Sequence, residues 1–428
     1  MANDTSNWRA RLGMHGFRAR GSSLRGMGAA AARVAMLAAT LSLGACGAFN
    51  TAGNGGASDD LAVAAPVDPV QTQALPAPQG ATQIGTGPVK VALILPLTQG
   101  TAPSSVGTSL RNAADLALSE AGNTDITLLV KDDQSTPAGA QAAAQAAVAD
   151  GADLIIGPLY SPNVRAAAGI TTAAKKPMIA FSTDASVAQP GVYLLSFLVE
   201  TYVDRIVDYA MSQGKRSFAA LIPDNDYGRI AAAEFQQVAA RRGVRVMEID
   251  HYQPQTMNAA VQKIAALGNQ IDALFIADQA SAMPAMARAL TANNLNSHKL
   301  QILGTGLWND PRVLSLPALQ GAWFAAPDNT GFNAFAARYR AKYGSDPTRI
   351  ATLSYDAVSL AVALAHRPGP DRFSTAILTN RAGFNGADGV FRFQPNGLND
   401  RGLAIMKIDN GMAAQVSPAP HVLTASST

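Results

Sequence analysis

The feature that most constrains this chain is a short, wholly apolar run followed at once by the start of a helix. Residues 154–156, Leu-Ile-Ile, suit a strand that is covered on both faces of a parallel sheet. Gly157-Pro158 ends the strand, and Ser161-Pro162 is typical of an N-cap with proline in the first helical turn. Ligands of open α/β sheets bind beside such strand ends, although a simple tight turn explains the loop equally well.

This run belongs to a first series in which strands and helices alternate. The expected strands cover residues 89–95, 126–130, 154–156 and 177–181. The expected helices run over 109–121, from Thr136-Pro137 to Gly151, and over 161–174. Strict alternation of this kind predicts a parallel, doubly wound sheet with right-handed crossovers.

A second series of the same kind follows a helix expected around residues 203–211. Its strands are expected at 217–222, 244–249, 273–277 and 300–303, with a helix after each of the first three. The last hundred residues hold two more helices, the second over 350–365, and short strands at 389–393 and 403–408. The fold class expected is therefore α/β, with two doubly wound parallel-sheet lobes.

The N-terminus has the pattern of an export signal. Residues 1–45 contain six arginines before an apolar segment over 34–43, which is too short to span a membrane and matches a signal-peptide core. Leu43-Gly-Ala-Cys46 then resembles the bacterial lipobox, in which the cysteine is lipidated after cleavage. Cys46 is the only cysteine, so the chain has no internal disulfide. The alternatives are an ordinary signal peptide with a chance cysteine, or a free thiol.

The segment after Cys46 is expected to be a tether. Residues 46–87 are mainly Ala, Gly, Pro, Gln, Thr and Asp with one aromatic, a composition that buries too little apolar surface to offset ordering. Beyond residue 45 the chain carries 27 basic and 29 acidic side chains, so the basic pI comes from the leader. With no basic stripe and interleaved aromatics, nucleic-acid binding is excluded.

Several segments in this order resemble the leucine-binding-protein family of type I periplasmic binding proteins. They are Val-Ala-Leu-Ile-Leu-Pro-Leu97, Arg-Asn-Ala-Ala-Asp-Leu-Ala117, Lys-Asp-Asp-Gln-Ser-Thr-Pro137, Ile-Ile-Gly-Pro-Leu159, Asp-Tyr-Gly228 and Ser-Tyr-Asp-Ala357. The resemblance covers about residues 88–410. It implies two lobes joined by three crossings, a ligand cleft between them and closure by hinge bending.

The resemblance also implies domain boundaries. Residues 1–45 are the lipoprotein signal peptide, 46–87 the tether and 88–412 the binding-protein domain. Within that domain, lobe 1 is expected to comprise 88–197 and 326–383, and lobe 2 to comprise 198–325 and 384–412. Residues 413–428 are expected to be a loose tail.

Candidate ligand-contacting residues follow the strands, where both lobes are expected to face the cleft. They are Tyr160, Ser161, Ser182, Thr183 and Asp184 in lobe 1, and Asp226, Tyr227, Asp278, Gln279 and Trp308 in lobe 2. An amino-acid site needs donors for the carboxylate, such as Ser161 and Ser182, and an acid for the ammonium group. Trp308 has core packing as its alternative role.

Within the family, two subgroups are relevant: solute-binding subunits of amino-acid transporters, and lipoprotein activators of penicillin-binding proteins. Pro-Met-Ile-Ala-Phe-Ser-Thr-Asp184, Leu-Gly-Thr-Gly-Leu-Trp-Asn309 and Gly-Phe-Asn-Gly-Ala-Asp-Gly389 resemble the activators more. Asp184 occupies the place where amino-acid binders have a hydroxyl donor, and a carboxylate there would repel a substrate carboxylate. Those binders also place an acid just after the strand that here ends at Leu303, and only Asp278, from the preceding strand, can substitute.

Nothing in the sequence indicates an enzyme. It has no P-loop, no G-x-S-x-G elbow and no HExxH motif, and its histidines lack metal-ligand spacing. We therefore expect no catalytic residue, no metal and no cofactor. The leading interpretation is a lipid-anchored, periplasmic, non-catalytic activator of a penicillin-binding protein in peptidoglycan synthesis. Gly47 after the cysteine favours the outer membrane. The alternative is a solute-binding subunit of an ABC transporter for amino acids or a similar small polar ligand.

Overall fold

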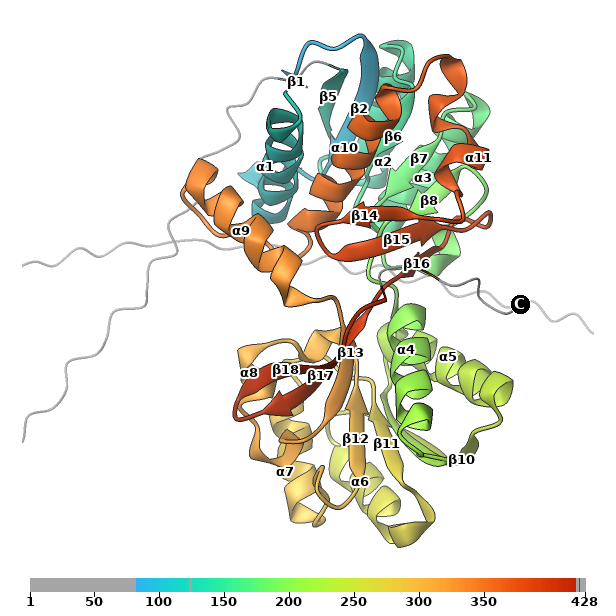
Figure 1. The fold of residues 1–428 in the computed structure, drawn as a ribbon, viewed down its shortest axis with the longest axis vertical. Coiled ribbons are helices and arrows are strands. Elements are labelled where there is room, and N and C mark those ends of the chain that lie inside the picture. Colours follow the sequence, from blue (N-terminus) through green and yellow to red (C-terminus); the bar gives the residue numbers. More distant parts are fainter. Residues whose placement is uncertain (1–81, 123–124, 421–422, 424–428) are drawn as a thin grey trace, which may run out of the picture. The chain divides into compact units, whose positions relative to one another are not determined.

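A computed structural model describes residues 82–122, 125–420 and 423 of the chain. The signal peptide, the lipidation candidate Cys46 and all but the last residues of the expected tether lie outside this range. Among the described residues, no helix is both long enough and apolar enough to cross a bilayer. The described chain folds into two α/β lobes (Figure 1).

Lobe 1 is built on a six-stranded sheet in the order β1-β5-β2-β6-β7-β8, in which only β1 is antiparallel. Its strands are β1 (Gln83–Ile84), β2 (Val89–Leu95), β5 (Ile126–Asp132), β6 (Leu154–Ile156), β7 (Met178–Ala180) and β8 (Val192–Leu194). A two-stranded ribbon, β3 (Thr98–Gln99) and β4 (Ala102–Pro103), follows β2.

The helices of lobe 1 cover both faces of this sheet. One face packs on α1 (Ser105–Glu120) and α10 (Ala351–Ala365), and the other on α2 (Pro137–Ala149) and α3 (Ser161–Ala173). Successive residues of β2 alternate between these two cores, because side chains of a strand point to opposite faces. The remaining helices are α9 (Asn329–Tyr343), which packs on α1, and the short α11 (Thr375–Leu378).

Lobe 2 repeats this plan on a seven-stranded sheet in the order β10-β9-β11-β12-β13-β17-β18. Its strands are β9 (Ser217–Pro223), β10 (Arg245–Tyr252), β11 (Ala273–Ile276), β12 (Gln301–Gly304), β13 (Trp323–Ala326), β17 (Ala404–Asp409) and β18 (Met412–Ser417). The first five are parallel, and β17 and β18 are antiparallel additions. Its helices are α4 (Val199–Ser212), α5 (Asp226–Arg242), α6 (Met257–Ala266), α7 (Met283–Ala292) and α8 (Pro311–Leu314).

The two-lobed α/β architecture expected from the sequence is confirmed, whereas two local expectations differ from the structure. Ser161 is the first residue of α3, whose N-cap is Tyr160 and has no side-chain cap. The strands β8 and β13 were not expected, because runs of three or four residues carry little periodic signal. Gly157 after β6 is in a left-handed conformation, and a Cβ there would lie 1.9 Å from the Ile94 carbonyl oxygen, so only glycine fits.

The chain passes between the lobes three times. Residues 195–198 connect β8 to α4, residues 327–328 connect β13 to α9, and residues 402–403 connect β16 to β17. Since the chain leaves each lobe at the carboxyl end of a parallel strand, the carboxyl ends of both parallel sheets face the other lobe (Figure 1).

The third crossing does not lie where the resemblance placed it. A separate three-stranded sheet, β14 (Phe384–Gly386), β15 (Gly389–Phe393) and β16 (Asn399–Arg401), precedes it. Phe391 and Phe393 of β15 belong to the core of lobe 1, so residues 384–401 pack with lobe 1 rather than lobe 2. The expected loose tail also begins later, because β18 pairs with β17 as far as Ser417.

Candidate functional site

All ten residues predicted to contact a ligand lie in loops, or in first helical turns, that follow strand carboxyl ends and face the other lobe. Lobe 1 contributes the loops after β6 and β7, and lobe 2 contributes those after β9, β11 and β12. We call these loops the interlobe loops. The structure shows that their side chains differ widely in burial and in how far their polar groups are already engaged.

In lobe 1, Asp184 is held by its own loop. Its Oδ1 accepts hydrogen bonds from the Ser186 amide (3.0 Å) and hydroxyl (2.6 Å), and its own amide donates to the Ser182 hydroxyl (3.1 Å). The Ser186 hydrogen bond lowers the pKa of Asp184 against the effect of burial, with smaller contributions from Ser161 and from Arg165, 3.9 Å away. Asp184 is therefore an ionised carboxylate that caps a short 3-10 turn. Because its Oδ1 already accepts two hydrogen bonds from Ser186, it can accept few more from a ligand.

Two other lobe 1 candidates are open to solvent. Tyr160 keeps 39% of its surface exposed, and Thr183 is also exposed. Among the described residues, neither side chain makes a hydrogen bond or ion pair, and both stand at the edge that faces lobe 2. These two side chains are free to adapt to whatever lies between the lobes.

In lobe 2, Tyr227 and Asp278 are the positioned candidates. The Tyr227 hydroxyl lies 2.8 Å from the Thr305 hydroxyl, and burial raises the pKa of Tyr227. Asp278 is buried and accepts hydrogen bonds from the Tyr252 hydroxyl (2.6 Å) and from the Gln279 amide (2.7 Å). These groups form a fixed polar surface at the carboxyl ends of β9, β11 and β12.

The remaining lobe 2 candidates do not contribute to that surface. The side chain of Asp226 is 94% exposed and pairs only with Arg229, and Gln279 is exposed. Trp308 has no exposed surface and packs in the core of lobe 2. Its ring lies over Gly304, where a Cβ would come within 2.5 Å of the indole. Trp308 is therefore a core residue, in agreement with the core packing expected for it as an alternative to a place in the cleft.

Two residues of the first crossing helix were missed by sequence reasoning. Glu200, in the first turn of α4, has a buried Oε2 without a hydrogen-bond partner among the described residues. Burial raises its pKa, and the negative charge of Asp184 raises it further. Its own charge acts on Tyr227. Glu200 therefore lies between the lobe 1 and lobe 2 parts of the site. The sequence carries no signal for this role, because acids are common in the first turn of a helix.

Tyr202, two residues further along α4, is buried, and burial raises its pKa. Its ring packs so closely on Gly306 that a Cβ there would lie 2.5 Å from the ring. Tyr202 thus joins α4 to the loop after β12 and fixes that loop beside Thr305. The interlobe part of lobe 2 is rigidly built by aromatic packing.

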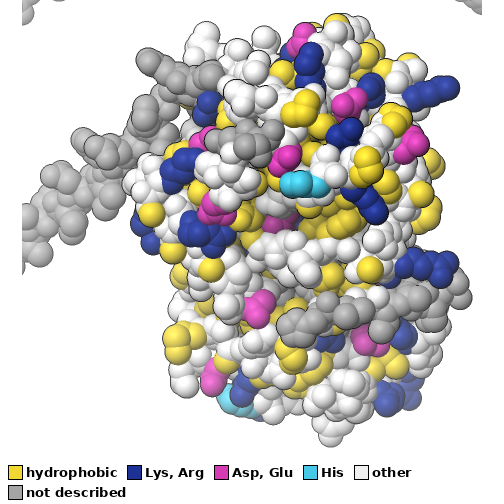
Figure 2. Space-filling view, turned by 45° about the horizontal axis from the view of Figure 1, so that its top comes forward, with side chains coloured by type: hydrophobic (Ala, Val, Ile, Leu, Met, Phe, Trp, Pro, Cys, Tyr) yellow, Lys and Arg dark blue, Asp and Glu magenta, His cyan; other side chains and the backbone are white. Residues whose placement is uncertain are grey.

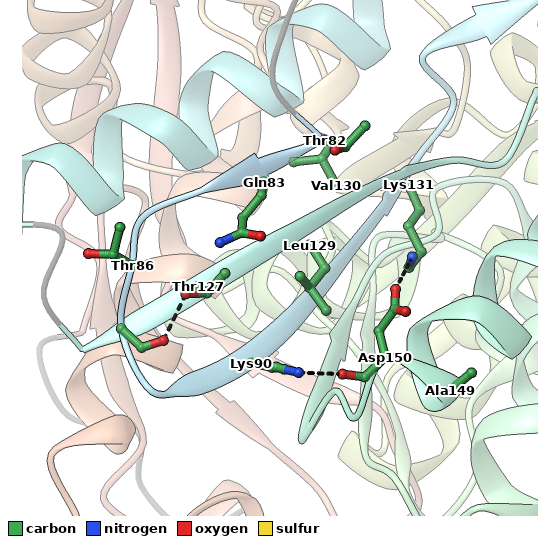
Figure 3. Close-up of a pocket in the computed structure, with 11 residues that line it drawn as sticks. Thr82, Gln83, Thr86, Lys90, Thr127, Leu129, Val130, Lys131, Ala149 and Asp150 are labelled. Carbon is green, nitrogen blue, oxygen red and sulfur yellow. Dashed lines mark hydrogen bonds and ion pairs between the residues drawn. The ribbon is translucent and has the colours of Figure 1, made fainter.

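The described chain also has a hollow away from these loops. It has a volume of about 780 Å³, lies beside the edge strand β1 and its neighbour β5, and is lined by none of the ten candidates (Figure 3). Lys90 donates to the Asp150 carbonyl oxygen (2.9 Å), and Lys131 pairs with the Asp150 carboxylate (2.7 Å). Because these polar groups satisfy one another at the surface, we favour the interlobe loops as the ligand site.

Among the described residues, neither the surface charges nor the acidic side chains form a further candidate site. On the face shown in Figure 2, basic and acidic side chains are interspersed and do not gather into one patch. Among the described residues, no group of three or more His, Cys, Asp or Glu side chains is arranged to hold a metal ion. The arrangement of the interlobe loops suits non-covalent binding of a small polar molecule.

The chain has two α/β lobes joined by three crossings, and the carboxyl ends of the parallel strands in each lobe face the other lobe. This is the architecture of a type I periplasmic binding protein. The sequence profile described as "Periplasmic binding protein" matches residues 88–413, and the chain belongs to that family. Membership implies a periplasmic location. The family comprises non-catalytic binding proteins, in agreement with the prediction that the chain is not an enzyme.

Solved structures share this fold at low sequence identity. One is a branched-chain amino acid ABC transporter periplasmic ligand-binding protein from Burkholderia xenovorans LB400 (17% identity, 77% of this chain and 95% of that chain, TM-score 0.64). Another is an ABC transporter substrate-binding protein from Desulfitobacterium hafniense in complex with Leu (20%, 77% and 99%, TM-score 0.57). A third, from R. palustris, is in complex with 4-hydroxybenzoate (19%, 78% and 98%, TM-score 0.57). No curated protein sequence matches the chain.

Proposed function

We propose that this protein is a solute-binding subunit of an ABC transporter that encloses a small polar ligand between its lobes. The observation that carries the proposal is a set of positioned polar groups in lobe 2, the Tyr227–Thr305 pair and the buried Asp278, at the carboxyl ends of strands that face lobe 1. The names of similar structures support transport of amino acids or aromatic acids as the activity to test.

The charges of the site favour a ligand with an amino group. Asp184, Glu200 and Asp278 lie on or beside the interlobe loops, whereas Arg165 is the cation that pairs with one of them. Opposite charge stabilises a bound ligand, and like charge costs free energy in a partly buried site. We therefore expect leucine-like amino acids or other amines to bind better than aromatic acids without an amine.

Calorimetry on the full chain tests this proposal with leucine and 4-hydroxybenzoate as probes. Binding of leucine, with a stabilisation of about 2.7 kcal/mol at 100 times its Kd, is the expected result. Glu200→Gln is expected to weaken leucine binding about tenfold, whereas the matched variant Asp226→Asn, at an exposed acid, leaves it unchanged. No heat and no thermal shift with any of the standard amino acids or amines would contradict solute binding.

A second candidate is a lipid-anchored activator of a penicillin-binding protein. It is favoured by Asp184, whose carboxylate is occupied by Ser186 and stands where a substrate carboxylate would need a donor. In this case the interlobe site is empty of solute, and a peptidoglycan synthase binds the outer surface. Co-purification of a class A synthase, together with a rise in its polymerisation rate on adding the protein, is the expected result. Absence of both would remove this candidate.

Either candidate includes a lipid anchor at Cys46, with the outer membrane as the expected destination. The cysteine follows the export pattern of residues 1–45, and it lies outside the described residues. Incorporation of a radiolabelled fatty acid into the natural chain, and its loss in Cys46→Ser, is the expected result. Labelling that persists in Cys46→Ser would show that the anchor is elsewhere.

A further inference from the structure

Two arginines and three phenylalanines form a continuous stack at the lobe junction. The Arg349 guanidinium carbon lies 4.5 Å from the ring centre of Phe332 and 5.0 Å from that of Phe197. The Arg401 guanidinium carbon lies 4.7 Å from Phe197 and 5.6 Å from Phe391. Rings and cations therefore alternate in the order Phe332, Arg349, Phe197, Arg401, Phe391. We call these five residues the hinge stack.

The hinge stack touches every passage of the chain between the lobes. Phe197 belongs to the first crossing, Phe332 to the first turns of α9 just after the second, and Arg401 ends β16 at the third. Any change in the angle between the lobes must rotate these three crossings, so it must also slide the faces of the stack over one another.

The two arginines differ in how their charge is balanced. Arg349 makes two hydrogen bonds to Asp388, at 3.0 and 2.7 Å, and Asp388 also accepts from Thr352. The Arg401 side chain is 1% exposed, and none of its three guanidinium nitrogens has a hydrogen-bond partner among the described residues. A buried guanidinium without direct hydrogen bonds is costly, so the charge of Arg401 is less well satisfied than that of Arg349.

The nearest acid to Arg401 is likewise incompletely satisfied. Asp356 of α10 is fully buried, and its Oδ2 lies 3.9 Å from Arg401 Nη2 without a hydrogen-bond partner among the described residues. Its Oδ1 accepts from the Ala387 amide at 2.6 Å. A direct charge-assisted hydrogen bond needs a separation of about 2.8 Å, so a displacement of about 1 Å would form one.

We propose that Arg401 and Asp356 form a hinge latch, in which the third crossing moves between this separated position and an engaged position with a direct ion pair. Engagement displaces the Arg401 guanidinium on the face of Phe197 in the first crossing, and through this contact it changes the separation of the lobes. The latch adds regulation to the proposed solute binding, but it operates in the absence of any solute. It acts on the opening of the interlobe site without touching the ligand.

The latch responds to pH because its acid titrates near neutrality. Burial raises the pKa of Asp356 to about 7, opposed by Arg401 of β16 and assisted by Asp388, while the Ala387 and Asp388 amides lower it. Arg349 and Tyr202 also act electrostatically on Arg401. Below pH 7 Asp356 is neutral and the latch is released, and above pH 7 the carboxylate attracts Arg401.

Distances between spin labels on the two lobes test the latch without solute. The full chain with Cys46→Ser carries labels at Gln141→Cys on α2 and Gln237→Cys on α5, both of which are exposed positions. Pulsed electron-paramagnetic-resonance measurements between pH 5.5 and 8.5 are expected to show a shift in the label distance with a midpoint near pH 7.

Substitutions separate the latch from a general effect of pH. Asp356→Asn is expected to abolish the shift, and Arg401→Lys, which keeps the charge but loses the planar stack, is expected to reduce it. Asp133→Asn, at another fully buried acid of lobe 1, is expected to leave it unchanged. A distance that does not depend on pH in the unsubstituted protein, or a shift that survives in Asp356→Asn, overturns the proposal. The measurement on the unsubstituted protein is decisive even if a variant fails to fold. Neither outcome depends on whether a solute binds.

Discussion

The two lobes present equivalent edges to each other, yet they satisfy the polar groups on those edges in different ways. In lobe 1 the loop after β7 is self-contained, since Asp184 is bonded to Ser186 in the same loop. In lobe 2 the contacts join different strands, as in the Tyr227–Thr305 and Tyr252–Asp278 pairs. A ligand would therefore meet a preformed surface on lobe 2 and an adaptable one on lobe 1, which is what a closing site requires.

The largest expected effect concerns the core beneath the lobe 2 surface. Trp308→Ala removes a fully buried indole that packs over Gly304, and it is expected to lower the free energy of unfolding by about 3–5 kcal/mol. Urea titration measures this loss. If the variant is no less stable, the ring is not part of the core and the rigidity of the lobe 2 edge has another origin.

The second-largest effect is expected at Asp356 in the hinge, which lies outside the interlobe loops of both lobes. Because the pKa of Asp356 is about 7 in the folded chain against an ordinary 3.8, the folded state holds the proton more tightly. The free energy of unfolding should therefore fall as the pH rises from about 4 to 7, by an amount on the order of 4 kcal/mol if this group acts alone. Denaturant titrations at several pH values, repeated on Asp356→Asn, measure the slope that this residue contributes. An unchanged slope in the variant would assign it to other groups.

A smaller effect is expected at Glu200, between the two edges. Its pKa is raised mainly by burial, so it takes up a proton at a higher pH than an ordinary glutamate, and an amine ligand loses its attraction when it does. Leucine affinity should then be several-fold lower at pH 5 than at pH 7.5. In Glu200→Gln the affinity should be low at both values. Calorimetry at the two pH values decides between this account and one in which another acid holds the amine.

The smallest effect is expected on the lobe 1 edge. The pKa of Asp184 is lowered by its hydrogen bonds, so it stabilises the fold above its unfolded pKa, and this contribution is lost as the pH falls through the lowered value. The carboxylate is partly exposed, so Asp184→Asn is expected to cost less than about 1 kcal/mol at pH 7. A loss of several kcal/mol in thermal unfolding would show that lobe 1 is as rigidly built as lobe 2.

The sheets could be predicted from sequence because their central strands are continuous apolar runs. Residues 89–95 and 217–222 are almost wholly buried, and the helices between strands have clear starts and stops. The strands of the small third sheet are short and mixed in polarity, so nothing in residues 384–401 shows which lobe they join. Their assignment depends on Phe391 and Phe393, whose partners in the core of lobe 1 are distant in sequence.

The candidate site was predictable in position but less so in detail. Strand ends predict that the ten candidates lie on the edges facing the other lobe, since parallel strands share one edge, and their contact with a ligand stays a prediction. The burial of Trp308 could not be inferred from its place after a strand. Its indole packs against the backbone of Gly304, where a side chain would leave no room for the ring. The hinge stack could not be inferred at all, since Arg349 and Arg401 are ordinary basic residues until folding brings both against Phe197.

The three crossings have a consequence for biogenesis. Lobe 1 obtains α10 and lobe 2 obtains β17 only from the last quarter of the chain, so neither lobe is a continuous stretch of sequence. A nascent chain that emerges N-terminus first can complete neither core until synthesis is almost finished. The protein should therefore stay unfolded long enough to be threaded through a secretion channel, and a truncation before α10 at residue 351 should destroy both lobes together.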